Sequence, residues 1–207
     1  MAEPLLPLPA SFGDSVSRSS NAGFTLIDTM ITLLIFGILS ATAAPVFMDM
    51  TKSMRLGQAI RDVERELQTA RLKAVTSNQP IRVRFNCPAA GQFRMVEVIG
   101  TPTVPVSTDA LTNAGRCSEA AYPFPATDDN PLTRPNHDGP LRRLHETLSF
   151  GSNAAIEFWP DGSAHRQTGS ENPWSVAPTT GVNLTVTDGT NTRTVQVNSL
   201  GKIRIVQ

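Results

Sequence analysis

The chain has 207 residues, of which 40% are hydrophobic and 17% charged, and its 18 basic and 18 acidic side chains give zero net charge. This length suits one domain with appendages or two small domains. Zero net charge excludes a nucleic-acid-binding protein that acts through a global positive field, although a local basic patch is compatible with it. One Tyr and two Trp leave little surface for stacking on single strands, and three His with two Cys are too few for a zinc finger or ribbon.

An apolar segment near the N-terminus decides the class of protein. Residues 1–23 contain Pro and Ser without periodicity, and residues 30–48 then run for 19 positions without a charge. As a helix rising about 1.5 Å per residue, this run spans the roughly 30 Å of a bilayer's hydrocarbon core. A cleavable secretory signal, with small residues at Ala41, Ala43 and Ala44, and a plain membrane anchor are two ordinary interpretations.

Neither interpretation accounts for the start of the apolar segment, which reads GFTLID from Gly23 to Asp28. AGFTLID followed by an uninterrupted apolar helix resembles the class III signal of type IV pilins and pseudopilins, whose usual form is GFTLIE. The resemblance implies that a prepilin peptidase cuts after Gly23 and methylates the new N-terminal residue, Phe24. It also puts Pro45 where many pilins carry a helix-bending proline. The leader is long for the family, and Asp28 replaces the usual Glu.

Asp28 admits two interpretations. In the simpler one it is an interfacial acid in the first helical turn, where unsatisfied N–H groups and the helix dipole favour negative charge. In the other, because a carboxylate in an apolar helix is costly, it pairs with the cationic N-terminus that cleavage creates at Phe24, its own or a neighbouring subunit's. The resemblance implies that this pair registers subunits during assembly, although Asp is one methylene shorter than Glu.

The flanking charges conflict with the pilin signal. Arg18 precedes the apolar run, whereas Lys52, Arg55 and Arg61 follow it, so the positive-inside rule would leave the C-terminal part in the cytoplasm. The signal implies a cytoplasmic leader and a translocated body, and the two cysteines fit an oxidising periplasm. We therefore expect a single-pass inner-membrane protein with a periplasmic C-terminal head, which later enters a pilus or pseudopilus.

Beyond Pro45 the pattern predicts an amphipathic helix, which Asn78 and Pro80 end, followed by strands. Its apolar stripe consists of Ile60, Val63, Leu67, Ala70 and Ala74. The other, solvated faces carry charged residues: Arg61, Asp62, Glu64, Arg65, Glu66, Arg71 and Lys73. Alternation predicts half-buried strands at 81–85 and 93–98.

Residues 100–147 form a Pro-rich insertion, and loops of this length are usually functional or disordered. Strand patterns resume at 155–159, and 182–187 with 192–197 predict a hairpin before a last strand at 202–206. The expected fold class is α+β and type IV pilin-like: a long N-terminal helix, half transmembrane and half amphipathic, packed on an antiparallel β-sheet head.

The C-terminal third carries a second resemblance. IEFWPDGSA, a hairpin with Asp-Gly at its turn and NSLGKIRI follow one another from about residue 150 to the end. This order is similar to the GspH/FimT group of pseudopilins and minor pilins, in which F-x-x-x-G and a closing G-[RK]-x-[RK] recur. The resemblance implies a structural subunit whose partners are the prepilin peptidase, other pilin or pseudopilin subunits and the inner membrane, with no small-molecule substrate.

Cys87 and Cys117 are the only cysteines. In a chain bound for the periplasm they suggest one disulfide, with two reduced, buried thiols as the alternative. A disulfide closing a loop of about thirty residues stabilises a fold by roughly 3–4 kcal/mol in the chain-entropy model.

Few other side chains suggest chemistry. His137, His145 and His165 have neither metal-ligand spacing nor a recognisable partner acid or Ser, so we expect surface residues. Residues 128–130 (Asp-Asp-Asn) offer oxygen ligands for calcium but lack a coordination loop. Without a phosphate-binding loop or a Ser-His-Asp constellation, the sequence predicts no catalytic residue, no metal site and no cofactor, and hence no enzyme.

The C-terminus carries the most informative local charge. From residue 182 onward one acid, Asp188, stands against Arg193, Lys202 and Arg204. On a strand Lys202 and Arg204 point to one face, where two cations on a rigid edge suit DNA phosphates. Members of the FimT-like branch, which resemble this tail, use its basic residues to bind DNA during uptake. The alternative is a charged edge strand that prevents sheet-to-sheet aggregation.

Arg82 and Arg84 also share a face, which alternation predicts to point outward, but nothing in the sequence places them beside the tail. In a neutral chain with few cations, DNA binding per molecule would be weak, and multivalency along a filament would have to supply the rest.

The sequence therefore predicts a non-enzymatic structural protein with three parts: a prepilin leader at 1–23, the transmembrane and assembly half of the N-terminal helix at 24–51, and a periplasmic head at 52–207. The first hypothesis is a GspH/FimT-like minor subunit of a type IV pilus that contacts DNA. The second is a minor pseudopilin of type II secretion. The third, from another class of protein, is an unprocessed membrane-anchored periplasmic binding domain.

Overall fold

The computed structural model describes residues 23–101, 104, 106–127, 132–152, 155–167 and 174–206. It contains one long helix, α1 (Leu26–Ser77), of 52 residues with Pro45 inside it. The chain divides into two compact units, one that ends at Pro45 and one from Val46 to Gln207, which we call the C-terminal unit.

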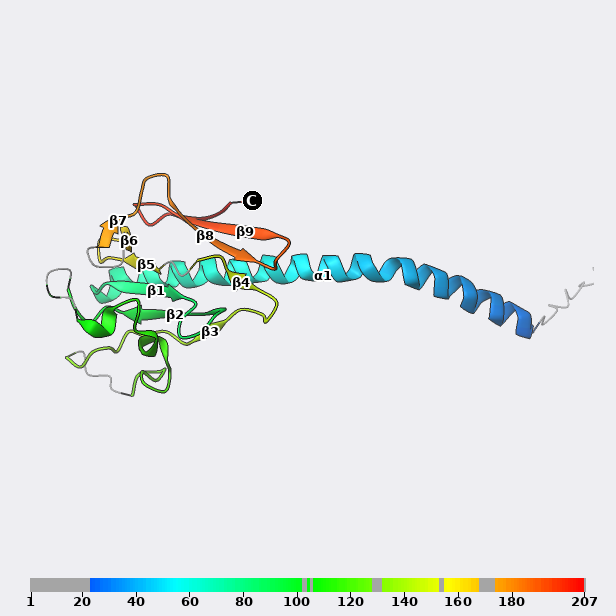
Figure 1. Cartoon of the computed structure of the whole chain (residues 1–207), viewed down its shortest axis with the longest axis horizontal. Helices are drawn as coiled ribbons and strands as arrows, with labels where there is room; N and C mark the ends of the chain where they lie inside the picture. Colours follow the sequence, from blue (N-terminus) through cyan, green and yellow to red (C-terminus); the bar gives the residue numbers. More distant parts are fainter. Residues whose placement is uncertain are drawn as a thin grey trace, which may run out of the picture. The chain divides into compact units, whose positions relative to one another are not determined.

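In the C-terminal unit α1 lies along the strands and buries the stripe that its sequence predicts (Figure 1). The buried apolar residues of the helix are Leu56, Ala59, Ile60, Val63, Leu67, Ala70 and Ala74. The helix ends at Ser77, and the next residue, Asn78, has a φ of 53°, a conformation that Asn adopts more readily than most residues.

Glu66 corrects one prediction on this helix. The sequence assigns it to the solvated faces, but only 6% of the residue is exposed. Glu66 follows Val63 by three positions and precedes Ala70 by four, so helical spacing places it on the edge of the apolar stripe itself.

Two antiparallel sheets complete the C-terminal unit. One has six strands in the order β3-β2-β1-β5-β6-β7, and the other has four in the order β10-β9-β8-β4. The strands are β1 (Ile81–Phe85), β2 (Gln92–Glu97), β3 (Arg142–Arg143), β4 (Ser149–Phe150), β5 (Ala155–Phe158), β6 (Ala164–Gln167), β7 (Trp174–Val176), β8 (Val182–Thr187), β9 (Thr192–Val197) and β10 (Ile203–Val206).

The α+β fold with a long N-terminal helix on antiparallel strands is confirmed, as are the β8–β9 hairpin and strands at each predicted place. The predictions missed β3, β4, β6 and β7. β3 and β4 have two residues each, too few for alternation to appear, and the sequences of β6 and β7, AHRQ and WSV, do not alternate between apolar and polar residues in a way that marks a strand.

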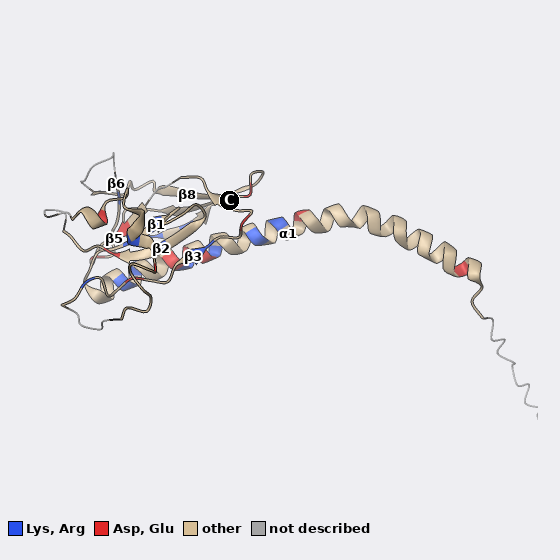
Figure 2. Cartoon of the chain, turned by 60° about the horizontal axis from the view of Figure 1, so that its bottom comes forward, with Lys and Arg blue, Asp and Glu red and all other residues tan. Residues whose placement is uncertain are grey.

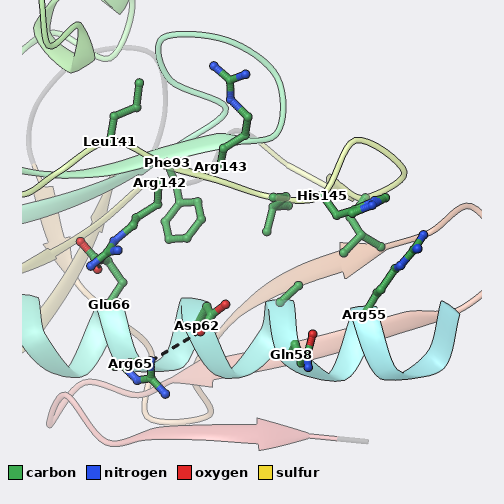
Figure 3. Close-up of a pocket in the computed structure, with 13 residues that line it drawn as sticks. Arg55, Gln58, Asp62, Arg65, Glu66, Phe93, Leu141, Arg142, Arg143 and His145 are labelled. Atoms are coloured by element: carbon green, nitrogen blue, oxygen red, sulfur yellow. Dashed lines mark ion pairs between the residues drawn. The ribbon is translucent and has the colours of Figure 1, made fainter. Parts of the chain in front are cut away.

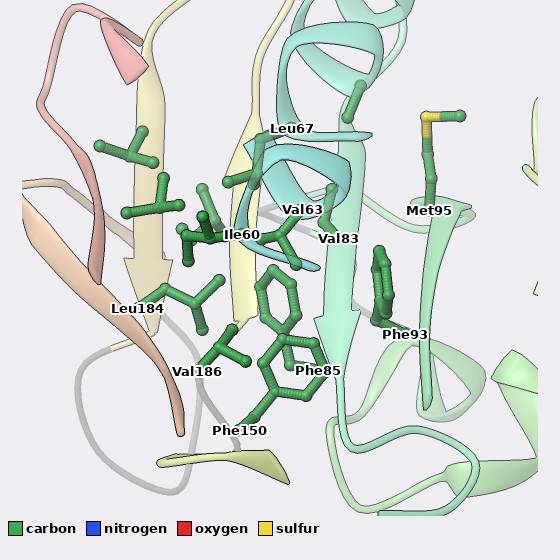
Figure 4. Packing of buried hydrophobic residues seen from close by; sticks show 14 of the residues in the cluster. Ile60, Val63, Leu67, Val83, Phe85, Phe93, Met95, Phe150, Leu184 and Val186 are labelled. Carbon is green, nitrogen blue, oxygen red and sulfur yellow. The ribbon is translucent and has the colours of Figure 1, made fainter. Parts of the chain in front are cut away.

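The hydrophobic core is shared by α1 and both sheets (Figure 4). The ring of Phe150, from β4, lies 5.0 Å from that of Phe85 and 5.5 Å from that of Phe93, between centroids. β8 contributes Leu184 and Val186 from the four-stranded sheet. One core therefore fixes both sheets against the same face of the helix.

The prediction that Arg82 and Arg84 point outward to solvent is wrong, because the insertion covers them. All five residues of β1 are buried, with Arg82 4% and Arg84 3% exposed. Two short 3₁₀ helices, Ser107–Asp109 and Ala114–Cys117, form part of the insertion, whose backbone carbonyls accept hydrogen bonds from both arginines. Strand alternation correctly predicts that Arg82 and Arg84 share one face of the sheet, but the insertion covers that face.

Candidate processing, assembly and surface sites

The start of α1 is closed by a capping box. Asp28 Oδ2 accepts hydrogen bonds from the Thr25 backbone N–H (3.2 Å) and the Thr25 hydroxyl (2.8 Å). In return, the Asp28 N–H donates to Thr25 Oγ1 at 3.3 Å. Thr three residues before an acid is the sequence signature of this cap. The Asp28 carboxylate is therefore held at the backbone N–H of Thr25, the residue after Phe24. The nitrogen of Phe24 is the predicted N-terminus after cleavage.

The first half of α1 is mostly apolar. Between Asp28 and Asp49 the helix carries no charged residue (Figure 2). Among the described residues α1 is the one helix that is long and apolar enough to cross a membrane, judged by length and composition, and its most apolar stretch is not buried inside the structure. Gly23 and Phe24 are both exposed, and residues 1–22 of the predicted leader lie outside the described residues.

The C-terminal cations fall on two faces. Among the described strands β10 pairs with β9 alone. Lys202, which directly precedes β10, and Arg204 within it are exposed, whereas Ile203 and Ile205 between and after them pack against the core. Arg204 lies opposite Gln196 in the β9–β10 register. Arg193 is an odd number of residues from Gln196, so its side chain leaves the sheet on the opposite face. The structure thus brings Lys202 and Arg204 together but not Arg193.

Arg71 joins the two turns that carry the tail motifs. Its Nε donates to the carbonyl of Gly162 and its Nη2 to that of Leu200, both at 3.0 Å. Gly162 closes F-x-x-x-G, and Gly201 opens G-[RK]-x-[RK]. A Cβ on Gly201 would lie 2.3 Å from the Gly162 carbonyl oxygen and 2.6 Å from Arg71 Nε. Gly201 therefore permits close backbone approach to the Gly162 turn around one helical arginine, a relation that sequence spacing did not reveal.

A layer of buried arginines lies under the insertion. Arg94 is 0% exposed and donates to the carbonyls of Gly139 (2.7 Å), Tyr122 (2.7 Å) and Cys117 (3.3 Å). Arg84 donates in the same way to the carbonyls of Asn113 and Leu111. Burial, with a smaller contribution from neighbouring Arg82, lowers the pKa of Arg84 to about 10.

Carboxylates complete this layer. Arg116 pairs with Asp138, and Arg82 donates to Glu157 Oε2 through Nε (3.0 Å) and Nη2 (2.7 Å). A charged group can be kept in a low-dielectric interior when it is paired with an opposite charge and hydrogen-bonded, and these residues meet both conditions. These residues hold the insertion on the sheet, so we assign them no binding role.

The predicted disulfide is confirmed. Cys87 follows β1, Cys117 ends the second 3₁₀ helix, and their sulfur atoms are bonded. The bond ties the insertion to the six-stranded sheet beside the contacts made by Arg94. Both half-cystines are buried.

The three histidines lie apart. His137 Nδ1 is 3.1 Å from Glu97 Oε2, an acid partner that the sequence did not suggest, and His145 is exposed. His165 is buried rather than at the surface, with its ring stacked 3.9 Å from that of Trp159, and burial lowers its pKa. Within the described ranges no group of three His, Cys, Asp or Glu side chains is placed to hold a metal ion. Residues 128–130 lie outside those ranges.

A groove of about 470 Å³ lies between α1 and residues 141–148 (Figure 3). Two ion pairs lie in its lining: Arg65 lies 3.7 Å from Asp62, and Arg142 Nε lies 3.5 Å from Glu66 Oε2. Burial raises the pKa of the Glu66 carboxyl, and the nearby Arg142 opposes this effect. Sequence reasoning missed the groove because its outer wall includes β3, which has no strand signature.

Comparison with known proteins defines the class. Residues 59–201 match the family model of the type II transport protein GspH, and residues 18–44 match the prokaryotic N-terminal methylation motif. Because the first match covers more than half of the chain, the chain belongs to the GspH family. This is a family of structural pseudopilins, and the motif implies processing by a prepilin peptidase and assembly with other pilins.

A search of curated protein sequences gives no match. Among solved structures, the minor pseudopilin EpsH from the type 2 secretion system of Vibrio cholerae aligns with 10% identity and a TM-score of 0.40. The alignment covers 73% of this chain and 96% of that chain.

Proposed function

We propose that the chain is a minor subunit of a type IV pilus. The observation that carries this proposal is the presence on one chain of the methylation motif at 18–44 and a GspH-family unit at 59–201. In this proposal 1–23 is the leader, 24–51 anchors the subunit in the inner membrane and then in the filament, and 52–207 is the periplasmic head. The subunit contributes structure and contacts rather than catalysis.

Cleavage between Gly23 and Phe24 is the first testable step. Co-expression with a prepilin peptidase should give a product whose intact mass corresponds to Phe24–Gln207 plus one methyl group. Gly23→Val should block cleavage, whereas Gly37→Val, a glycine inside the apolar helix, should leave the site intact. A precursor that keeps its leader beside an active peptidase would favour the membrane-anchored binding domain instead.

Asp28 is proposed to pair with the methylated amine of Phe24, on its own chain or on a neighbour. The capping box supports this role because it already orients the carboxylate toward the end of the helix. Asp28→Ala should be cleaved normally yet enter filaments poorly. Thr25→Val, which removes the hydroxyl donor but keeps the carboxylate, should assemble better than Asp28→Ala; equal, normal incorporation of both variants would show that the carboxylate is dispensable.

DNA contact through the C-terminal strand is the finer part of the proposal. Its support is that Lys202 and Arg204 share the exposed face of β10, while Arg193 is assigned no direct contact. The full chain in detergent micelles, titrated with duplex DNA, should bind more weakly as salt rises. Lys202→Ala/Arg204→Ala should abolish most binding, and Lys52→Ala/Arg61→Ala, which removes the same charge from α1, should not. No binding at low salt would leave the two cations as protection of an edge strand.

A second candidate is a minor pseudopilin of type II secretion, which the description of the matched family as a type II transport protein favours. Its partners would be other pseudopilins. Deletion of the gene distinguishes the two candidates: loss of surface pili supports the first, and loss of protein secretion with normal pili supports the second.

A further inference from the structure

We propose that the outer edge of β3 binds an extended, acidic segment of a partner protein. We call this surface the β3 edge and define it as the side of residues 141–145 that faces away from β2. β3 is the last strand of the six-stranded sheet, and among the described strands it pairs with β2 alone. The β3 edge does not belong to the sheet that contains β10, so it adds a protein contact to the proposed function.

The hydrogen bonds between β2 and β3 show which backbone groups point outward. In an antiparallel pair, residues whose backbone groups bond to the neighbouring strand alternate with residues whose groups point away from it. The Leu144 N–H donates to the Gly91 carbonyl at 2.8 Å, and Arg142 lies opposite Phe93 in the same register. The backbone groups of Leu144 and Arg142 therefore face β2, and those of Arg143, between them, face outward.

The residues on either side follow the same alternation. The Leu141 N–H donates to Glu119 Oε1 at 2.7 Å, and the His145 carbonyl accepts the Leu148 N–H at 2.8 Å. These two outward groups are bonded within the chain, so they mark the ends of the open stretch. Between them, Arg143 offers one outward N–H and one outward C=O, with which an incoming strand can pair.

Positive charge flanks Arg143 on both faces of the sheet. Arg142 points toward α1, where its Nε lies 3.5 Å from Glu66 Oε2, whereas the Arg143 side chain points away from the helix (Figure 3). Arg55 is the first residue of α1 that lines the groove described above. Arg55 and Arg143 are exposed, and within the described ranges neither forms an ion pair. Acidic side chains on either face of an incoming strand would thus meet a cation.

The groove supplies room for side chains on the helix-facing side of that strand. Its volume is about 470 Å³, and its lining includes the apolar side chains of Ala59, Phe93, Leu144 and Leu148. Successive side chains of an extended segment point to opposite faces. The segment that fits best therefore has apolar residues facing the groove, acids on the Arg143 face, and a further acid at the end of the groove beside Arg55.

A second copy of this chain does not suit the same edge. Two β3 strands laid side by side would set Arg142 and Arg143 of one copy against the same arginines of the other. Like charges on neighbouring strands are destabilising, and charged residues on an edge strand prevent self-pairing. The arginines therefore select a partner of opposite charge.

Hydrogen exchange on the full chain in detergent micelles tests the backbone pairing directly. The probe is the capped peptide Asp-Glu-Val-Glu-Val-Glu-Asp, and its control carries Lys at every acidic position. The acidic peptide should bind and slow the exchange of the Arg143 amide. The Leu144 amide, already bonded to Gly91, should exchange slowly with or without the peptide. No binding of the acidic peptide, or equal binding of the Lys peptide, would overturn the proposal.

Two substitutions at one position separate the backbone from the charge. Arg143→Ala removes the charge but keeps the N–H, and it should weaken peptide binding about threefold. Arg143→Pro also removes the outward N–H, which β2 does not use, and it should weaken binding about tenfold further. Equal affinities of the two variants would refute pairing along the β3 edge. Peptide binding to the unchanged chain that leaves the Arg143 amide in fast exchange would refute it as well.

Charge reversal on α1 tests the end of the groove. Arg55→Glu should weaken binding of the acidic peptide at least about threefold. Arg61→Glu makes the same change at an exposed position of α1 that does not line the groove, and it should leave affinity within about twofold. Equal losses in both variants would mean that the net charge of the chain attracts the peptide, and would overturn the assignment to this groove.

Discussion

At the residue scale, the main lesson of this protein is where its charged side chains lie. Arg82, Arg84 and Arg94 alternate with apolar residues, as side chains on a solvated sheet face do, and yet all three are buried. Their guanidinium groups donate to carbonyls of the insertion, a segment distant in sequence and without regular pattern. Alternation fixes which face a side chain takes but carries no information about a loop that later covers this face, so these roles were not predictable.

Arg94 gives the sharpest test of this layer. Arg94→Met leaves three insertion carbonyls without their buried donor, while Asp138 keeps its pair with Arg116, so the change should lower the free energy of unfolding by about 3–5 kcal/mol. Urea denaturation of the full chain in detergent, followed by tryptophan fluorescence, measures this loss. Arg166→Met, at an exposed position of β6, should change stability by less than about 0.5 kcal/mol. Similar values for both would mean that Arg94 does not hold the insertion.

Glu66 predicts a dependence on pH. Burial raises its pKa in the folded state, so the folded protein binds the proton more tightly than the unfolded chain does. The contribution of Glu66 to stability should therefore rise as pH falls from neutrality through its raised pKa toward 4.5. Glu66→Gln removes the cost of a buried charge and should stabilise the protein at pH 7 by about 1 kcal/mol, with the gain shrinking at lower pH.

The matched control for this change is Glu64→Gln, two residues earlier on the same helix and less buried. Denaturation at pH 5, 6, 7 and 8 should show the pH-dependent difference for Glu66→Gln only. A loss of stability at pH 7 in Glu66→Gln would instead make the ion pair with Arg142 the larger effect.

At the element scale, the turn before β10 depends on glycine for a different reason than the turn of the β8–β9 hairpin does. Gly201 and Gly189 have φ values of 70° and 92°, but a Cβ has nothing within 4 Å at Gly189 and would meet the Gly162 oxygen and Arg71 at Gly201. Gly189→Ala should thus cost only backbone strain, about 1–2 kcal/mol. Gly201→Ala should cost more and increase hydrogen exchange across β10. Equal costs would show that the close approach is not limiting.

The insertion and the sheet are joined by both a covalent bond and the arginine layer. Cys87→Ala/Cys117→Ala should lower the free energy of unfolding by roughly 3–4 kcal/mol, the value expected for closing a loop of this length. If Arg94 and Arg84 hold the insertion independently, limited proteolysis should cut within 107–127 only after Arg94→Met is added to the double variant. Cleavage in the double variant alone would make the disulfide the main restraint.

The sequence predicted these elements unevenly. The helical stripe, the hairpin with its Asp-Gly turn and the first two strands carry strong periodicity, and all are present. β3 and β4 are two-residue strands that exist only because they pair with β2 and β8, which are distant in sequence. Of the candidate sites, the disulfide and the shared face of Lys202 and Arg204 were predictable from two cysteines and from alternation. The pairing of Arg71 with two distant turns was not, because no local pattern encodes a contact across 129 residues.

At the scale of the whole molecule, membership of the GspH family and the methylation motif agree with what the first thirty residues and the last sixty predict separately. Both signals are local motifs, which is why sequence reasoning reached them. The choice between a pilus and a secretion system depends on partners, and partner choice is a property of surfaces that one chain does not specify.

The contacts of Arg71 also order events in time. Leu200 follows Arg71 by 129 residues, and pairings of such long range form late in folding. In the proposed topology the leader stays in the cytoplasm and the C-terminal part crosses the membrane in sequence order, so the helix would emerge before the residues that bind Arg71. The last turn and strand would then close the fold as its final step, so a prematurely ended chain would lack the joint between helix and sheets.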